Sequence, residues 1–311
     1  MEQVLSMPAI NQAKIRIYGH TGFIGTHLVN YFIEQGCLFK NLELYGGETD
    51  LLNRKPPSKT LADYTFNLTG INGGLTTNLS KGAELFTENA FLTLNLLRHE
   101  VNFSRKILNT IPSCAYPSTP NLIREQDLWN GPCHASVLGH GVSKRLLDTF
   151  AKLCSTKTCS VINITPTTVY GAPNHLSLER TKVLESLIIK FIRAKRDKTP
   201  SVTLMGTGDS FREFIYVKDL MPLMVKAMTD YYDVLPLNIT SAQEFRLEVL
   251  ADLIKKEVGY EGRIEWDGNE QGEFRKGLSI ARQTAYLGGF PFTPFETGLK
   301  ETVMWYQEQL S

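Results

Sequence analysis

The sequence lacks an excess of charge of either sign. Its 311 residues hold 33 Lys and Arg against 32 Asp and Glu, which gives a formal net charge of +1. This balance excludes the broad basic surface by which proteins bind nucleic acid or anionic membranes, so any cationic site must be local. No apolar run approaches the ~18 residues that a membrane span requires. We therefore expect neither a nucleic-acid partner nor a membrane partner.

We also expect no secretory leader, because residues 1–14 contain no charged segment followed by an apolar stretch. Cysteine is scarce, with five residues in all and no pair spaced as Cys-x-x-Cys. An odd number without that spacing argues against a disulfide framework and against a zinc site. The sequence thus predicts a cytoplasmic protein with reduced thiols and no metal.

Strand-like and helix-like segments alternate along the first half of the chain. Strands are predicted near residues 14–18, 42–45, 64–68, 106–111 and 160–164, and helices from Phe23 and over 82–100 and 138–153. The last of these helices places Val142, Leu146, Phe150 and Leu153 on one face. This alternation predicts an α/β fold with a Rossmann-type, doubly wound parallel sheet.

The rhythm changes after Pro166. Helices are predicted near residues 183–195, 217–229, 247–258 and 295–309, separated by short strands and Gly/Pro-bearing loops. We therefore predict a dinucleotide-binding domain over residues 1–165 and a smaller α/β substrate lobe over 166–311, with some chain crossing back to the first domain.

A glycine-rich loop joins the first strand to the first helix. It contains Gly19, Gly22 and Gly25, with the cofactor contacts expected at these glycines and at Thr21, Phe23 and Ile24. Glycines at this turn let the backbone approach a pyrophosphate, and the helix N-terminus offers N–H groups to it. The loop predicts NAD(H) or NADP(H), with NAD(H) slightly favoured because no Arg follows the second strand before Arg54.

Several motifs in one order carry a family resemblance over nearly the whole chain. They are Gly19–Gly25, Asp50-Leu51-Leu52-Asn53, Ser113-Cys114-Ala115-Tyr116-Pro117, Pro166-Thr167-Thr168-Val169-Tyr170-Gly171, and Gly206-Thr207-Gly208 followed by Arg212-Glu213-Phe214-Ile215-Tyr216. The sequence resembles the extended short-chain dehydrogenase/reductases that modify nucleotide-sugars. Its pattern is most similar to the members that combine 3,5-epimerisation with 4-keto reduction. The resemblance implies an enzyme, a nucleotide-sugar substrate, and a homodimer formed through the helices at 82–100 and 138–153.

The resemblance also implies a catalytic triad, and here the sequence departs from it. In the family, Ser or Thr, Tyr and Lys act together on the sugar oxygen while hydride moves at C4. Lys144 keeps the lysine, but His140 occupies the tyrosine position, four residues earlier on the helix. Pro112 occupies the serine position, and Ser113 follows it as a candidate.

Further site residues follow from the same motifs. Cys114 matches the epimerase cysteine, and Lys182 occupies the position of its partner histidine, with His175 nearby. For the cofactor, the resemblance implies Asp50 at the adenine, with Leu51, Asn67, Thr69 and Lys144. For the substrate it implies Arg212, Lys190 and Arg275 as cations, and Met205 where the family places a Trp against the base.

His140 leaves the reaction open. An imidazole near Lys144 and a cationic nicotinamide is driven toward the neutral form, which accepts protons well and donates them poorly. This favours oxidation of a sugar hydroxyl over reduction of a ketone. The alternatives are the 3,5-epimerase/4-reductase reaction, a 4-dehydrogenase, a dehydratase, an epimerase-only variant, or an inactive homologue that binds dinucleotide or nucleotide-sugar as a regulatory or assembly subunit.

Overall fold

A six-stranded parallel sheet forms the centre of the computed structural model, which describes residues 7–46, 51–52, 56, 58–119, 121–156, 158–173, 175–176, 181–269 and 273–310. The strand order is β2-β1-β3-β4-β5-β9. The strands are β1 (Ile15–Tyr18), β2 (Leu42–Tyr45), β3 (Ala62–Asn67), β4 (Ser104–Thr110), β5 (Ser160–Pro166) and β9 (Leu237–Ile239). Because the order reverses at β1, the sheet is doubly wound, as predicted.

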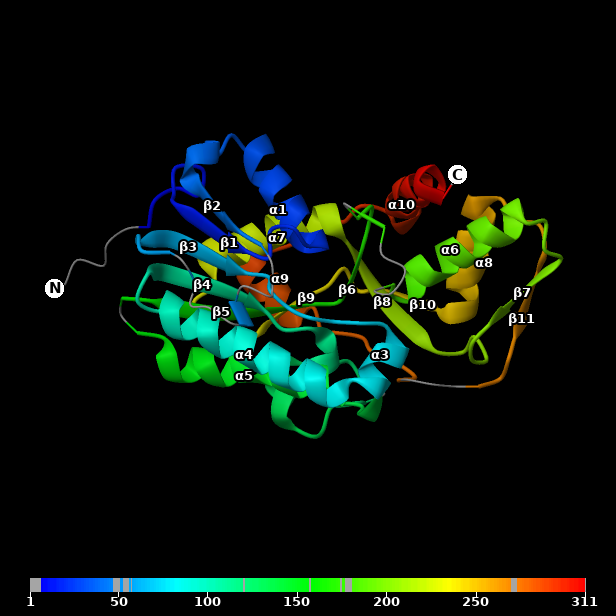
Figure 1. Ribbon diagram of the computed structural model, residues 1–311, viewed down its shortest axis with the longest axis horizontal. Coiled ribbons are helices and arrows are strands. Elements are labelled where there is room, and N and C mark those ends of the chain that lie inside the picture. Colours follow the sequence, from blue (N-terminus) through cyan, green and yellow to red (C-terminus); the bar gives the residue numbers. More distant parts are fainter. Residues whose placement is uncertain are drawn as a thin grey trace.

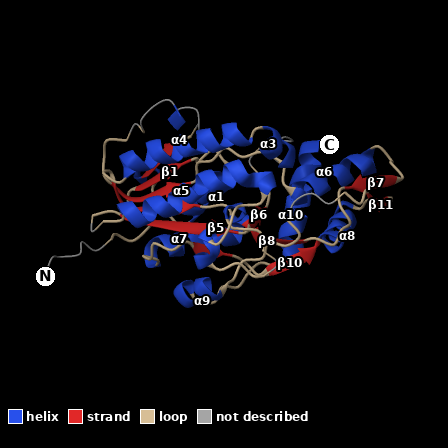
Figure 2. Ribbon diagram, turned by 90° about the horizontal axis from the view of Figure 1, so that it is seen from below, coloured by secondary structure: helices blue, strands red, loops and turns tan. Residues whose placement is uncertain are grey.

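Helices cover both faces of this sheet (Figures 1 and 2). On one face α1 (Phe23–Glu34) packs beside α7 (Val217–Asp230), and on the other α4 (Gly82–Glu100) packs along α5 (Leu138–Cys154). The short helices α3 (Leu75–Ser80) and α9 (Ala281–Leu287) border the same domain. Among the described residues, no helix is long and apolar enough to cross a membrane.

The second lobe lies beyond the carboxyl ends of β3, β4 and β5 (Figure 1). It contains α6 (Val183–Arg196), α8 (Leu247–Val258) and α10 (Phe295–Leu310). One small sheet orders β10 (Gln243–Arg246), β8 (Phe211–Tyr216) and β6 (Thr168–Tyr170), and a parallel pair joins β7 (Ser201–Leu204) to β11 (Arg263–Trp266). The predicted crossing of the chain is extensive, because α7 and β9 return to the main sheet after β8.

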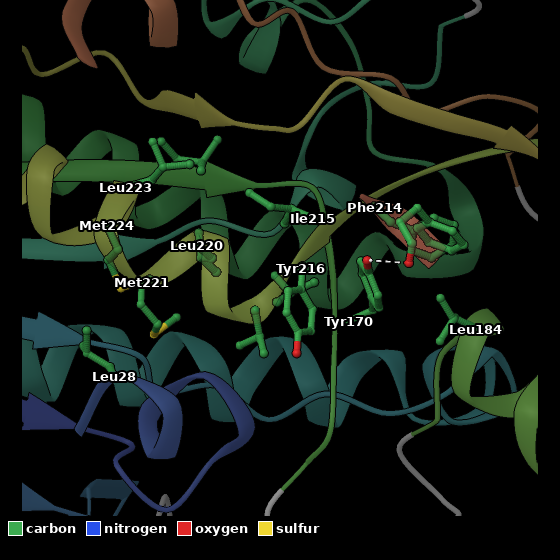
Figure 3. Packing of buried hydrophobic residues seen from close by; sticks show 14 of the residues in the cluster. Leu28, Tyr170, Leu184, Phe214, Ile215, Tyr216, Leu220, Met221, Leu223 and Met224 are labelled. Atoms are coloured by element: carbon green, nitrogen blue, oxygen red, sulfur yellow. Dashed lines mark hydrogen bonds between the residues drawn. The ribbon is translucent and has the colours of Figure 1, made fainter. Parts of the chain in front are cut away.

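One hydrophobic core runs through both lobes. Tyr170 of β6 lies between Phe214 and Tyr216 of β8 (Figure 3), with ring centroids 6.1 and 5.4 Å away, and packs on Phe295 of α10 at 5.1 Å. The Tyr170 hydroxyl donates to the Phe295 carbonyl. These aromatic contacts join β6, β8 and α10 of the second lobe to one another.

Helix α5 presents its polar side to the protein interior. His140, Ser143, Lys144 and Asp148 are buried, whereas the apolar face seen in the sequence is half-buried and Leu153 is 78% exposed. A helix in a monomer normally buries its apolar face. The arrangement brings polar groups of α5 to the carboxyl ends of the strands and leaves an apolar strip outside.

Lys106 of β4 is a buried cation with a strongly altered titration. Its Nζ has no hydrogen-bond partner among the described residues and lies 3.3 Å from the centroid of the Tyr232 ring. Burial lowers the pKa of Lys106 to about 7.

We predict that Lys106→Met raises the stability of the protein at pH 7 by about 2–4 kcal/mol, and by less near pH 10. The unfolded lysine titrates near 10.4, so between pH ~7 and ~10 the unfolded wild type binds a proton that the folded state does not. Wild-type stability therefore rises with pH in this window, and the variant loses that rise. Urea unfolding at several pH values measures the free energy of unfolding of the wild type and the variant. Lys256→Met, at an exposed lysine, is the control. A difference between variant and wild type that is constant with pH would contradict the assignment.

Candidate active site

A cleft of about 1200 Å³ separates the sheet's carboxyl edge from the second lobe. Its first wall comes from the start of α1, the segments that follow β3 and β4, and the start of α5. Its second wall comes from α6, the loop between β7 and β8, and the segment 273–276. Open α/β sheets bind ligands at this edge, outside the carboxyl ends of the strands.

The glycine loop is packed so tightly that two of its positions exclude any side chain. Gly19 has φ +82°, and a Cβ there would lie 2.9 Å from the Leu68 carbonyl oxygen. A Cβ on Gly25 would lie 2.2 Å from the Gly19 carbonyl oxygen. The backbone of the loop is therefore pressed against α1 and the end of β3, which creates the cradle that a dinucleotide pyrophosphate requires.

The start of α1 is open for an anion. Gly22 caps the helix without a side-chain hydrogen bond, so no side chain competes for the first N–H groups. Ile24, in the first turn of α1, lines the cleft. These features fit NAD(H) or NADP(H). The predicted contacts of the cofactor with Gly19, Thr21, Gly22, Phe23 and Gly25 stay a prediction, and these five residues are not among those that line the cleft.

The other predicted cofactor residues do not all line the cleft. Thr69 lines the cleft, and Asp50 lies outside the described residues. Asn67 and Leu51 do not line the cleft. Asn67 is buried and accepts from the N–H and hydroxyl of Thr69, so it shapes the turn. Leu51 packs in the core.

Lys144 connects α5 to the end of β3. Its Nζ donates to the Thr69 carbonyl oxygen at 2.7 Å, and the side chain is 4% exposed. Gly70 lies directly beside it, since a Cβ on Gly70 would be 3.2 Å from Nζ. The ammonium group is thus fixed in the cleft next to the strand that borders the cofactor cradle.

His140 lines the same wall one helical turn before Lys144. Burial, together with the positive charges of Lys144 and Lys182, lowers its pKa to about 3, and a hydrogen bond with the Ile71 backbone opposes this only in part. Nδ1 is buried and has no hydrogen-bond partner among the described residues. The ring is therefore neutral near pH 7, and a neutral imidazole can accept a proton.

Cys114 and Ser113 line the cleft opposite Lys182. Burial raises the pKa of the Cys114 thiol, while Lys276 and Lys182 oppose that rise. Cys114 is therefore a thiol near neutral pH. His175 is exposed and is not among the cleft residues, so Lys182 is the side chain brought to the predicted partner position.

Arg212 is the cation best prepared for an anionic ligand. Its Nη1 donates to the Phe211 carbonyl at 2.6 Å, and no carboxylate of a described residue lies within salt-bridge distance of its guanidinium. Burial lowers its pKa, and Glu273 opposes this. Lys190 and Met205 also line the cleft, as predicted.

Arg275 does not take its predicted place in the substrate site. Its guanidinium forms a bidentate pair with Glu244, with Nε–Oε1 at 2.8 Å and Nη2–Oε2 at 2.7 Å, and it does not line the cleft. The next residue, Lys276, faces the cleft and pairs with Glu273.

Some cleft residues escape sequence analysis. Trp266, Phe274, Glu273 and Asn78 line the cavity, and the Asn78 Oδ1 is a buried acceptor without a partner in the described part of the chain. Trp266 ends a four-residue strand, and only its strand-end position hinted at a site. Within the described ranges, no group of three His, Cys, Asp or Glu side chains could hold a metal ion.

Comparison with known proteins decides the family. Residues 15–239 match the NAD dependent epimerase/dehydratase family. The chain belongs to this family. The predicted resemblance to extended short-chain dehydrogenase/reductases and the Rossmann-type fold are confirmed, and the protein is an NAD(P)-dependent enzyme of the epimerase and reductase type.

Relatives match over almost the whole length. GDP-L-fucose synthase 1 of Arabidopsis thaliana is 29% identical over 310 residues, which cover 94% of this chain and 93% of that protein. Probable GDP-L-fucose synthase 1 of Oryza sativa subsp. japonica is 27% identical, with 96% and 93% covered. A GDP-L-fucose synthetase from Naegleria fowleri, crystallised with NADP, has a TM-score of 0.80 at 22% identity, with 95% and 93% covered. This last likeness shows a shared fold.

We predict that Gly25→Ala abolishes binding of reduced nicotinamide dinucleotide, because its Cβ would displace the Gly19 backbone from the cradle. The matched control is Gly289→Ala, where a Cβ meets no heavy atom within 4 Å and the glycine is not left-handed. Cofactor fluorescence titration measures both variants, and circular dichroism checks the fold. Unchanged cofactor affinity in a folded Gly25→Ala variant would refute the cradle.

Proposed function

We propose that the protein binds a nucleoside-diphosphate sugar in the cleft and exchanges hydride at the sugar C4 with NAD(P), with His140 as the proton acceptor. The relatives are named as GDP-L-fucose synthases, which supports a GDP-linked deoxyhexose as the substrate class. The observation that carries the proposal is a neutral His140 that lines the cleft four residues before the fixed ammonium of Lys144.

The cations of the cleft are suited to different parts of the substrate and the cofactor. Arg212 and Lys190 bind the diphosphate, since a guanidinium without a carboxylate partner suits phosphate oxygens. Lys144 orients the nicotinamide ribose beside Thr69. A bound NAD(P)⁺ would supply the hydride acceptor, and the neutral ring of His140 would accept the proton of the sugar hydroxyl.

His140 is a poor proton donor, and this property decides whether oxidation or reduction of the sugar is favoured. Reduction of a 4-keto sugar needs a proton delivered to the forming alkoxide, and a neutral imidazole whose pKa is about 3 is a poor source of that proton. Oxidation needs only an acceptor. We therefore infer that His140 favours the oxidation of the C4 hydroxyl over the reduction catalysed when a tyrosine stands there.

Epimerisation is a second candidate that Cys114 supports. The thiol lies in the cleft with Lys182 and Lys276 acting on it, so it can deliver a proton to a carbon next to a C4 ketone. Its raised pKa makes it a better donor than acceptor. Solvent deuterium entering C3 or C5 of the product would show this activity.

His140→Phe should slow hydride transfer at least 100-fold with unchanged cofactor affinity, because it removes the acceptor and keeps the shape. His140→Tyr should shift the ratio of reduction to oxidation toward reduction by at least 10-fold. Stopped-flow absorbance of the reduced nicotinamide measures both, with GDP-L-fucose for oxidation and the matching GDP-4-keto-6-deoxyhexose for reduction, each with NAD(H) and NADP(H). Faster reduction than oxidation by the wild type at pH 7 would overturn the proposed direction.

We also propose that the protein is a homodimer through α4 and α5. The outer surface of this helix pair exposes Phe91 (53%), Leu94 (50%) and Leu153 (78%), beside the half-buried Leu146 and Phe150. Apolar strips of this kind on two adjacent helices are typical of a surface that a second copy covers.

Phe91→Glu should convert the dimer into a monomer at micromolar concentration, because a carboxylate would be buried at the interface without a partner. Phe39→Glu, at an aromatic that is 66% exposed and lies between α1 and β2, should leave the dimer intact. Sedimentation velocity distinguishes the species. A wild type that stays monomeric at 50 µM, taken as roughly the upper end of ordinary dimer affinities, would contradict the interface.

A further inference from the structure

The second lobe contains an aromatic side chain at the far end of the cleft that no motif assigned. Parallel pairing of β11 with β7 places Trp266 opposite Leu204, the residue just before Met205. Both Trp266 and Leu204 line the cleft, at the end of the molecule away from the six-stranded sheet (Figure 1). Trp266 is therefore beside the position where the sequence lacks an expected Trp.

One side of the indole is supported by a rigid glycine loop. Gly206 and Gly208 have φ +92° and +86°, which only glycine adopts readily, and Asp267 accepts from the Gly206 N–H at 2.9 Å. A Cβ on Gly208 would be 3.0 Å from two atoms of the Trp266 ring. The absence of a side chain there lets the backbone lie against the indole and fixes its orientation.

Two cations stand close to this ring. Lys190 donates to the Thr203 carbonyl, on the strand paired with β11, and its charge acts on Asp267 next to Trp266. Arg212 follows the same glycine loop at the start of β8 and has no carboxylate partner among the described residues. A fixed aromatic surface next to unpaired cations is suited to a nucleobase with its phosphates attached.

We propose that Trp266 is the surface on which the nucleobase of the substrate stacks, with Arg212 and Lys190 holding the diphosphate. This inference rests on the proposed function and names the residue that recognises its nucleotide. Met205, which is 49% exposed and directly follows β7, flanks the stack as an adaptable apolar contact.

Calorimetric titration with GDP and with inorganic pyrophosphate tests the proposal. Trp266→Leu should weaken GDP binding by about 10-fold or more and leave pyrophosphate binding unchanged, because only GDP carries a base to stack. Trp266→Phe should recover most of the GDP affinity. Trp305→Phe is the matched control, because Trp305 is part of α10 and borders a separate hollow.

A second measurement does not depend on the folding of the Leu variant. In a protein that carries Trp129→Phe and Trp305→Phe, Trp266 is the sole tryptophan of the three in the sequence. Its fluorescence should be quenched by GDP and not by pyrophosphate. Three outcomes would overturn the stacking role alone. In Trp266→Leu they are an equal loss of affinity for GDP and pyrophosphate, or an unchanged affinity for GDP. In the single-tryptophan protein the outcome is fluorescence that bound GDP does not quench. A wild type that binds no GDP would contradict the proposed function as well.

Discussion

Helix α5 buries its polar face, and the rest of the site depends on this constraint. A buried ammonium, imidazole and carboxylate must each find partners, because an unpaired polar group in the interior costs several kcal/mol. Lys144 bonds to the Thr69 carbonyl, and Asp148 accepts from the Trp129 indole. These bonds hold the helix in one rotation about its axis. That rotation brings His140 into the cleft and turns Leu146, Phe150 and Leu153 toward the outside.

The same constraint sets the electrostatics of the chemistry. Around His140 the nearby charges are positive, from Lys144 and Lys182, and burial adds to their effect. A neutral imidazole is the result, which receives protons readily and gives them up poorly. At the opposite wall Arg212 and Lys190 supply positive charge for a diphosphate. A net charge of +1 is thus compatible with two phosphorylated ligands, since a few placed cations and the open start of α1 suffice.

The main sheet could be predicted because its strands are short, mostly apolar runs between turn signals, as in β1 and β4. The glycine loop could be predicted because the structure leaves no room for a side chain at Gly19 and Gly25. It also placed Lys144, His140 and Cys114 in one cleft through their motifs. It could not separate Arg275 from Lys276, since which of two adjacent cations meets Glu244 depends on how the segment crosses β10. The position of Trp266 in the cleft could not be predicted from the sequence, for a related reason. Its place in the cleft comes from pairing with β7, more than sixty residues earlier.

The protonation state of His140 is the central claim, and ¹⁵N NMR of the imidazole nitrogens tests it most directly. With all six histidines labelled and the His140 signals assigned by their loss in His140→Gln, the account predicts a neutral ring from pH 5 to 8. One ring nitrogen should carry a proton, and the other should show the shift of an unprotonated nitrogen. Titration of His140 near its ordinary pKa of about 6.5, or a ring protonated on both nitrogens at pH 7, would contradict the account.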